Sequence, residues 1–306
     1  MRKNKIIVVG IFVVDLSFKS TKLPKPGETV IGDSYNIGPG GKGSNQCVAI
    51  ARAGGDVSLI ARIGDDQFGK MGLHLYESEN VGVEGLVITK DEKTGSATIS
   101  IDSKGMNSII VVPGAASRLT NKMVDQKSNL FEESSILLTG FEIPLEVAKY
   151  SLKMAKSKNL KTILNPAPYF NINYETYKFV DYLTPNEHEA SALTNINIKT
   201  VDDARIAGKK ICELGVGTSI ITMGEKGVLC TRNSLDNEGL YLPSIKLKDQ
   251  VIDTVGAGDV FNGAFATAIS EGINLEESLI FANKAASISV TKIGAALSSP
   301  YRDQIK

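Results

Sequence analysis

Residues 253–265 read DTVGAGDVFNGAF, a glycine turn that runs directly into an amphipathic segment. Apolar side chains at helical spacing over Val260–Ile269 predict that a helix begins here. Gly256 and Gly258 leave backbone N–H groups open at the helix start, where such groups favour an anion. The turn therefore predicts an anion held beside the Asp259 carboxylate, whose pKa the helix dipole is expected to lower. A glycine turn capped by Asp259 explains the same residues equally well.

Short apolar runs alternate with amphipathic segments along the rest of the chain, which predicts an α/β fold with a doubly wound, mainly parallel sheet flanked by helices. The expected strands are Ile6–Val9, Ser58–Ala61, Ile136–Leu138, Thr162–Leu164 and Ser219–Thr222. The expected helices are Asn45–Ala53, Gln67–Asn80, Leu145–Lys158 and Asp202–Leu214, with a last one running from a capping box at Asn274 and Glu277 to about Val290.

Two regions break this alternation. Glu28–Ile37 and Thr94–Val112 read as short strands joined by glycine turns, with no helix to cover them. We expect them to form a small projecting β-sheet, built from about residues 11–38 and 94–114. An uncovered sheet serves as a lid, as a dimer face, or as both.

Composition and charge narrow the function classes. The 306-residue chain carries 34 basic and 34 acidic side chains, without the basic excess typical of nucleic-acid binding. Its three cysteines form no paired motif, so free thiols in a reducing cytosol are expected. No segment approaches the length of a membrane span, and the apolar run at 6–14, closed by Asp15, reads as a buried strand rather than a leader peptide. His74 and His188 are too isolated to form a metal cluster.

Two segments match familiar nucleotide-binding patterns only in part. Residues 64–70, GDDQFGK, have P-loop spacing, but Met71 stands where Ser or Thr is required and two aspartates would repel phosphate; a capped turn before a helix is expected instead. Residues 38–43, GPGGKG, match a dinucleotide fingerprint but lack its acidic partner about 20 positions later. The glycines there still let backbone approach a ligand, and Lys42 and Asn45 suit the hydroxyls of a sugar. A flexible surface turn is the alternative.

Two distant segments, GGKGSNQ at 40–46 and DTVGAGDVFNG at 253–263, together resemble the signatures of the ribokinase-like carbohydrate kinases. Further segments follow in the expected order: PGET at 26–29, GDD at 64–66, NPAP at 165–168, TPNE at 184–187 and ITMG at 221–224. The resemblance covers the whole chain, so residues 1–306 are expected to form one kinase domain. It implies ATP-dependent phosphorylation of a pentose at O5, with ribose as the first expectation and 2-deoxyribose as the second.

The resemblance also implies roles for individual residues. Asp259 is the expected catalytic base, and the amides of Gly256, Ala257 and Gly258 are the expected anion hole. Asn186 and Glu189 match an Asn-x-x-Glu motif that orders Mg²⁺ and phosphate. Nucleotide contacts are expected from Thr222, Gly224, Gly227 and Asn283. Sugar contacts are expected from Asp15, Gly41, Lys42, Asn45 and Glu142, with position 13 beside them. A potassium site is expected from Asp253, Val255, Ser289, Lys292, Gly294 and Ser298. A homodimer through the projecting sheet is expected as well.

One departure from the family pattern concerns the acceptor sugar. Val13 stands where ribose-specific members carry Asn, and deoxyribose-specific members are also apolar there. A buried hydroxyl without a partner costs about 1–3 kcal/mol, so this change favours a sugar that lacks one. Phe12 is expected to narrow the pocket further. Other acceptors (a hexose, a sugar phosphate or a nucleoside) and a regulator that binds sugar without catalysis remain alternatives.

Overall fold

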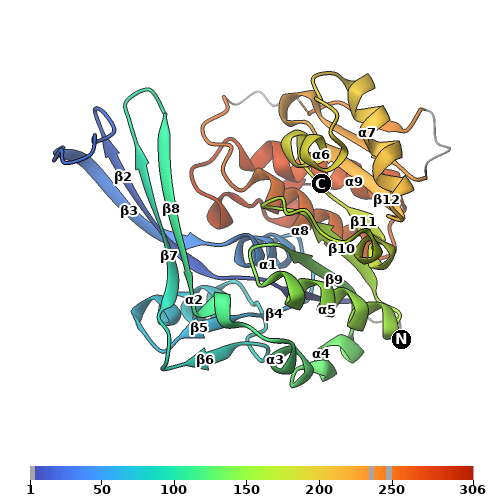
Figure 1. Ribbon diagram of the computed structural model, residues 1–306, viewed down its shortest axis with the longest axis horizontal. Coiled ribbons are helices and arrows are strands. Elements are labelled where there is room, and N and C mark those ends of the chain that lie inside the picture. The colour runs from blue at the N-terminus through green and yellow to red at the C-terminus, as the bar shows by residue number, and fades with distance from the viewer. Residues whose placement is uncertain (1–3, 234–237, 246–249, 306) are drawn as a thin grey trace.

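The central element of the computed structural model, which describes residues 4–233, 238–245 and 250–305, is an eight-stranded sheet (Figure 1). Its strand order is β14-β13-β12-β11-β10-β9-β1-β4. Pairing is parallel from β4 to β12 and antiparallel at the β12-β13-β14 edge. The strands are β1 (Lys5–Val9), β4 (Val57–Ile60), β9 (Ser134–Gly140), β10 (Lys161–Asn165), β11 (Tyr182–Leu183), β12 (Thr218–Thr222), β13 (Val228–Thr231) and β14 (Leu240–Leu242). All five predicted strands are present.

The helices lie close to their predicted positions, with two early starts that matter for the site. The helices are α1 (Lys42–Arg52), α2 (Gln67–Ser78), α3 (Asn121–Asp125), α4 (Ser128–Glu133), α5 (Leu145–Ser157), α6 (Glu187–Thr194), α7 (Val201–Glu213), α8 (Ala257–Ser270), α9 (Leu275–Ser289) and α10 (Arg302–Ile305). Helix α1 begins three residues before the predicted start, so Lys42 opens it. Helix α8 also begins before Val260, which places Asp259 in its first turn.

Side-chain caps explain several helix starts. Asp66 caps α2 by accepting from the N–H of Gly69 at 2.8 Å, as expected for a capped turn rather than a P-loop. The preceding strand is β5 (Arg62–Gly64), which pairs with β6 (Val87–Thr89). Asn274 caps α9 by accepting from Glu277 N–H at 3.0 Å, the backbone half of the predicted capping box.

Two apolar layers sandwich the central sheet and confirm the doubly wound class. Ile6 and Val8 of β1 join the layer built on α1, α8 and α9. Their neighbours Ile7 and Val9 join the layer built on α5 and α7. Because successive side chains of a strand point to opposite faces, one wholly buried strand serves both layers. Among the described residues no helix is long and apolar enough to cross a bilayer.

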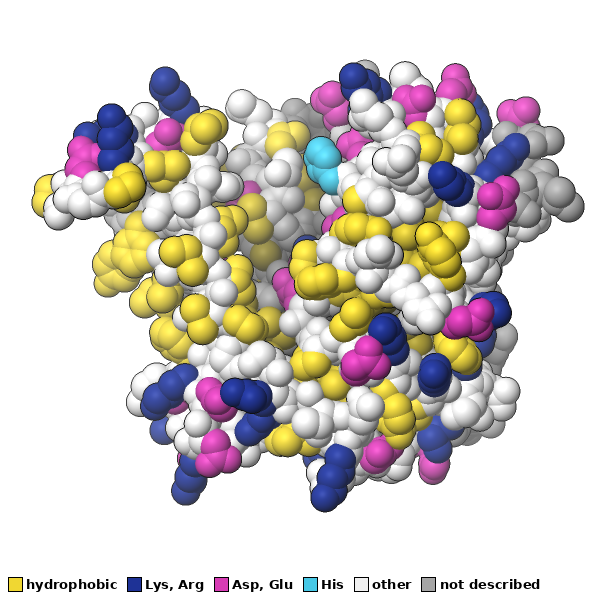
Figure 2. All heavy atoms as spheres, in the orientation of Figure 1, with side chains coloured by type: hydrophobic (Ala, Val, Ile, Leu, Met, Phe, Trp, Pro, Cys, Tyr) yellow, Lys and Arg dark blue, Asp and Glu magenta, His cyan; other side chains and the backbone are white. Residues whose placement is uncertain are grey.

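The small projecting sheet has four strands in the order β3-β2-β7-β8 (Figures 1 and 2). Its strands are β2 (Val13–Ser20), β3 (Gly32–Gly40), β7 (Thr94–Ile101) and β8 (Asn107–Gly114). Strand β3 begins at Gly32 rather than at the expected Glu28. Figure 2 shows apolar side chains over this sheet and a hollow between it and the main domain. On β8, Ile109, Ile110, Val111 and Val112 are each more than half exposed.

Candidate active site

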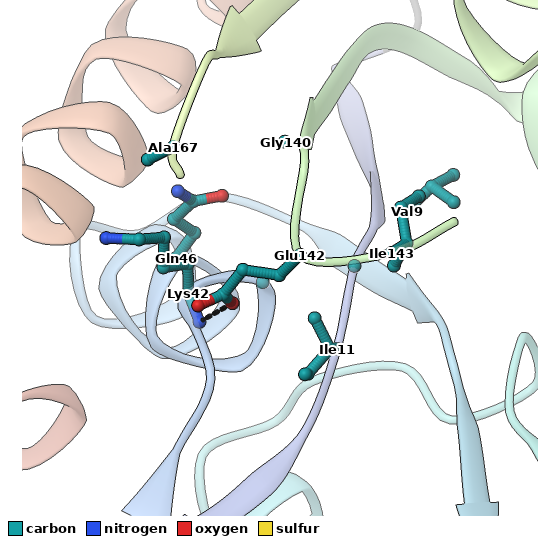
Figure 3. A pocket seen from close by; sticks show the side chains of 10 residues that line it. Val9, Ile11, Lys42, Gln46, Gly140, Glu142, Ile143 and Ala167 are labelled. Atoms are coloured by element: carbon teal, nitrogen blue, oxygen red, sulfur yellow. Dashed lines mark hydrogen bonds between the residues drawn. The ribbon is translucent and has the colours of Figure 1, made fainter. Parts of the chain in front are cut away.

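A pocket opens where the carboxyl ends of β1 and β9 meet the start of α1 (Figure 3). From β1 the chain continues through α1 to β4 on one side, whereas β9 lies on the other side and leads to α5. The connections after β1 and β9 therefore leave toward opposite faces of the sheet. This is the topological switch point at which open α/β sheets bind ligands. Figure 3 shows Glu142 beside Lys42 in this pocket, with Gln46 next to them.

The Asp259 carboxylate is held by two amides from α1. Asn45 Nδ2 donates to Asp259 Oδ2 at 3.0 Å, and Gln46 Nε2 donates to Oδ1 at 3.1 Å. The side chain of Asp259 is 5% exposed. No role was predicted for Gln46; its only signal in the sequence is its place directly after Asn45 in the GGKGSNQ segment. Both donors stabilise the ionised carboxylate.

Burial raises the pKa of Asp259 above its usual range, with Lys42, Asn45 and Gln46 opposing the rise. The expectation that the helix dipole would lower this pKa is therefore wrong, because the cost of burying the charge dominates. A raised pKa makes Asp259 a stronger base than an exposed carboxylate.

The predicted anion-hole amides differ in geometry. Gly256 adopts φ 77°, and a Cβ there would lie 2.7 Å from the Cα of Ala295, so only glycine fits. Ala257 N–H donates to Thr254 O at 3.3 Å within the turn. Gly258 is exposed, and no heavy atom beyond its chain neighbours and own helix lies within 4 Å of a Cβ built on it. The first N–H groups of a helix have no intrahelical acceptor, so the open side of Gly258 is where an anion can approach.

The start of α1 is completed by a distant carboxylate. Gly41 precedes this helix with φ 89° and offers no side-chain cap. Glu142 fills that role: its Oε2 accepts from the backbone N–H of Lys42 at 2.7 Å (Figure 3). Gly40 lies so close to the Asp15 carboxylate that any Cβ would overlap it. The structure thus brings together all four of these predicted sugar-side residues, Asp15, Gly41, Lys42 and Glu142.

Carboxylates outnumber cations in this cluster. Burial raises the pKa of Glu142 to about 7, with Lys42 opposing the rise, and burial raises the pKa of Asp15 to about 6. The pKa of Glu189 is also raised, first by burial. Asp259 raises the pKa of Lys42, so the ammonium stays charged. A neutral ligand rich in hydroxyls suits these acceptors better than an anionic sugar phosphate does.

Asn45 keeps an acceptor for a ligand. Its Nδ2 is used by Asp259, while within the described residues its buried Oδ1 accepts no hydrogen bond. A buried polar atom without a protein partner is uncommon, and it is free to accept a hydrogen bond from a ligand or from water. The hydroxyl of a bound sugar would satisfy it.

Residues 12 and 13 face opposite ways. Phe12 is fully buried, and its ring packs against Tyr76 with centroids 5.9 Å apart, in the apolar layer of α1 and α8. It does not line the pocket, so the expectation that Phe12 narrows the pocket is wrong; the period-two alternation of an extended segment turns it away. Val13, on the opposite side of the chain, is 4% exposed and joins the layer that includes Ile11, which lines the pocket.

Five of the predicted nucleotide residues lie at the start of α6, at the end of β12 and in the turn that follows: Asn186, Glu189, Thr222, Gly224 and Gly227. Asn186 and Glu189 form a complete capping box at α6, with both reciprocal bonds at 2.9 Å. A parallel bridge pairs Asn186 with Thr222 at the end of β12. Gly224 and Gly227, with φ of 53° and 96°, shape the turn that follows. Asn186 and Glu189 thus cap α6 and also lie beside the other predicted nucleotide residues.

Asn283 is buried, and its Nδ2 donates to Pro243 O at 2.8 Å. Asn283 therefore holds the loop that carries Pro243. A direct contact with adenine from this amide nitrogen would have to compete with that bond.

The predicted potassium residues lie on one loop system. Asp253 Oδ1 accepts from Val255 N–H and Oδ2 from Gly294 N–H, both at 3.0 Å, so this carboxylate ties together the segments before α8 and after α9. Ser289 closes α9, and Lys292 N–H donates to Ser289 O at 3.0 Å. Ser298 is buried on the same segment. Carboxylate, carbonyl and hydroxyl oxygens are the donors that a hard cation prefers.

The chain matches known kinases over nearly its whole length. The sequence model of the pfkB family of carbohydrate kinases matches residues 3–302. The chain is 36% identical over 306 residues to the ribokinase of Haemophilus influenzae, covering 99% of this chain and 97% of the relative. It is 38% identical over 303 residues to the ribokinase of Bacillus subtilis, covering 99% and 98%.

Solved structures agree. The Arabidopsis thaliana ribokinase complexed with ribose and ATP superposes with a TM-score of 0.92 at 32% identity, covering 98% of this chain and 96% of that one. The Thermotoga maritima ribokinase gives 0.87 at 40% identity, covering 98% and 97%. The paired glycine motifs, the switch-point pocket and these matches agree: the chain belongs to the pfkB family of carbohydrate kinases.

Proposed function

We propose that the protein transfers the γ-phosphoryl group of ATP to O5 of a pentose, with D-ribose as its substrate. The observation that carries this proposal is the buried carboxylate of Asp259, in the first turn of α8. Asn45 and Gln46 hold it by hydrogen bonds, and it lies next to the open side of Gly258. The relatives from Haemophilus influenzae and Bacillus subtilis are named ribokinases, and the Arabidopsis thaliana neighbour is described with ribose and ATP. These names support ribose as the first acceptor to test.

In the proposed reaction Asp259 accepts the O5 proton while O5 forms a bond to the γ-phosphorus and the bond to the ADP oxygen breaks. The N–H groups at the start of α8, where Gly258 has an open side, would stabilise the charge on the transferred group, and the Lys42 ammonium adds positive charge nearby. Phosphoryl transfer needs positioning and charge stabilisation more than early proton removal. A carboxylate that is fixed by two amides suits that requirement.

Magnesium fits the residues present. Among the described residues no three His, Cys, Asp or Glu side chains cluster closely enough to hold a metal alone. Mg²⁺ in kinases is held largely by substrate phosphates and water, with one or two carboxylates, so such a cluster is not needed. Glu189, with Asn186 beside it, would supply the protein's share. The bound ion would neutralise phosphate charge.

Potassium fits the Asp253 loop by donor chemistry, through Asp253, Ser298 and the carbonyls of Val255, Ser289, Lys292 and Gly294. Since Asp253 already ties Val255 to Gly294, a cation there would stiffen the turn that presents Gly256. We propose that K⁺ activates through that loop without touching the sugar.

A coupled ADP-release assay tests the proposed activity. The purified protein is offered ATP and Mg²⁺ with ribose, 2-deoxyribose, hexoses and nucleosides, in K⁺ and in choline buffers. We expect the highest kcat/KM with a pentose and a higher rate in K⁺. Sugar binding by calorimetry without turnover of any acceptor would instead indicate a silent regulator, and equal rates in both buffers would remove the potassium proposal.

A second acceptor, 2-deoxyribose, is favoured by Val13, which is buried in the same apolar layer as the pocket-lining Ile11 and has a side chain without hydrogen-bonding groups. Val13→Asn is expected to raise the ratio of kcat/KM for ribose over 2-deoxyribose by about tenfold, because one restored hydrogen bond contributes about 1 kcal/mol or more. The measurement is the ratio in wild type and variant. Val13→Leu, which keeps the site apolar, is the control, and an unchanged ratio in Val13→Asn would remove the role of residue 13.

We propose that the projecting sheet covers the pocket and pairs with a second copy of the chain. Its β8 strand exposes Ile110 by 68% and Val112 by 58%, and apolar faces of this kind mark interaction sites. Ile110→Glu is expected to shift the sedimentation mass from dimer to monomer. Asn121→Asp, on α3 away from the sheet, adds the same single negative charge and is the control. A monomeric wild type at high concentration would refute the dimer.

We also propose that the protein works in a reducing cytosol. Cys47, Cys212 and Cys230 form no disulfide in the described structure, which agrees with that compartment. Recovery of the native protein in a membrane or extracellular fraction would contradict it.

A further inference from the structure

A chain of buried polar side chains leads from Asp259 back to the start of its own helix. Gln46 Nε2 donates to Asp259 Oδ1 at 3.1 Å and also faces Asn165 Oδ1 at 3.4 Å. Asn165 Nδ2 donates to Thr184 O at 3.1 Å. Thr184 Oγ1 lies 2.6 Å from Asn262 Oδ1, and Asn262 Nδ2 donates to Gly258 O at 2.8 Å. The chain therefore closes on the residue next to Asp259.

The participants come from three elements and one loop and are almost fully buried. Gln46 belongs to α1, Asn165 ends β10, Thr184 follows β11 and Asn262 lies in α8. Their exposed fractions are 2% for Gln46, Thr184 and Asn262 and 7% for Asn165. Buried polar groups are costly unless satisfied, and fully connected ones fix a single arrangement. Two of the segments singled out in the sequence, NPAP and TPNE, begin with Asn165 and Thr184, to which no role was assigned.

Two backbone carbonyls set the direction of every bond in the chain. Gly258 O only accepts, so Asn262 presents nitrogen to it and oxygen to Thr184, whose hydroxyl must donate. Thr184 O also only accepts, so Asn165 presents nitrogen there and oxygen to Gln46. As a result the Gln46 amide cannot flip without placing its oxygen against two other oxygens.

These fixed orientations determine which groups face Asp259. Both of its carboxylate oxygens face NH₂ groups, from Asn45 and from Gln46. We propose that the buried chain from Gln46 to Asn262 is a set of positioning residues that aims the Asp259 carboxylate and fixes it against the start of α8. None of the four side chains needs to touch the substrate. The inference rests on the proposed phosphoryl transfer, because it assigns these residues to the base of that reaction.

The pH profile of kcat separates positioning from bulk stability. Asp259 is active when ionised, so activity falls as pH drops through its pKa. Gln46→Met keeps the volume but removes a donor that favours the ionised form, so the acid limb is expected to move up by about one pH unit. We expect kcat to fall about 10- to 100-fold, the factor carried by one charge-assisted hydrogen bond, with KM values changing by less than about threefold. The charged groups facing Asp259, namely Lys42, Glu142 and Glu189, are the same in both proteins.

A variant in the second half of the chain tests the hold on the start of α8. Thr184→Val removes the hydroxyl that donates to Asn262 and lies 3.4 Å from Leu164 O, but it keeps the Thr184 carbonyl that orients Asn165 and both amides at Asp259. A decrease in kcat of about tenfold is expected, because Asn262 loses the partner that keeps its Nδ2 on Gly258 O, next to Asp259. Tyr76→Phe is the matched control: it removes a buried 3.0 Å bond to Ser44 Oγ, also on α1, without touching Asp259. Its acid limb should stay where it is in the wild type.

The outcomes distinguish this inference from the proposed function. A wild type that phosphorylates no acceptor refutes the kinase proposal itself. An active wild type whose acid limb is unmoved in Gln46→Met, or moves equally in Tyr76→Phe, refutes the positioning role. Urea unfolding gives a readout without catalysis: Gln46→Met should lose more stability at a pH above the acid limb of the wild-type kcat profile than at a pH below it, because the lost bond favours ionised Asp259. Equal losses at both pH values would also overturn the inference.

Discussion

Asp259→Asn is expected to lower kcat by about 10³-fold, within the range that one positioned acid or base contributes. The carboxylate is the only group in the described site that is both buried at the start of α8 and held by two NH₂ donors. An amide of the same shape still accepts at one atom but takes no proton. It also turns an NH₂ group toward Asn45 or Gln46, which are donors themselves.

The control for this variant is binding measured without turnover. Because Asn45 Oδ1, Lys42 and Glu142 remain, ribose affinity measured by calorimetry should change by less than about tenfold. Removal of a buried carboxylate with a raised pKa also removes a desolvation cost, so the thermal midpoint should not collapse. Turnover within a few fold of wild type would exclude Asp259 as the base and redirect attention to Glu142.

The sequence predicted the parts of the site that depend on local backbone chemistry. The glycines at 40–43 and 256–258 give sharp turns into helices, and both turns lie where they were expected. The parallel strands were equally predictable, because a strand that is buried on both faces consists almost entirely of apolar residues. Lys42 and Glu142 meet at one pocket because one opens α1 and the other follows β9; Asp15 lies close enough to raise the pKa of Glu142, and Asn45 bonds Asp259.

The sequence did not reveal which way certain side chains point or how deeply they are buried. Phe12 was expected to narrow the pocket, yet successive side chains of an extended segment point to opposite faces, and Phe12 lies on the face turned away from the pocket. The pKa of Asp259 was misjudged because the dipole is a local property, whereas burial is set by all the elements that pack around the residue. Gln46 and Asn165 bond across 119 sequence positions, and nothing in either segment alone specifies that contact.

Gly258→Ala is expected to lower kcat/KM for ATP by about 10²-fold while the fold gains stability, two effects of opposite sign. Gly258 lies in α8 outside the positive-φ region, so alanine is a better helix former there, by up to about 0.5–1 kcal/mol. In the free protein no heavy atom beyond the chain neighbours and the helix's own backbone lies within 4 Å of the added methyl group. The same methyl group would occupy the open side of the helix start, where the phosphoryl group must approach the backbone.

Gly256→Ala is the matched comparison, because it carries the same change two residues earlier. Its φ of 77° and the 2.7 Å approach to Ala295 predict a loss of stability of about 1–3 kcal/mol together with the loss of activity. Thermal unfolding and steady-state kinetics on both variants separate the cases. If Gly258→Ala kept full activity, the anion would bind elsewhere than at the start of α8. If it lost stability as Gly256→Ala does, its effect on rate would reflect damage to the turn. Our proposal that the transferred phosphoryl group binds over Gly258 is supported only if Gly258→Ala is both more stable and slower than the wild type.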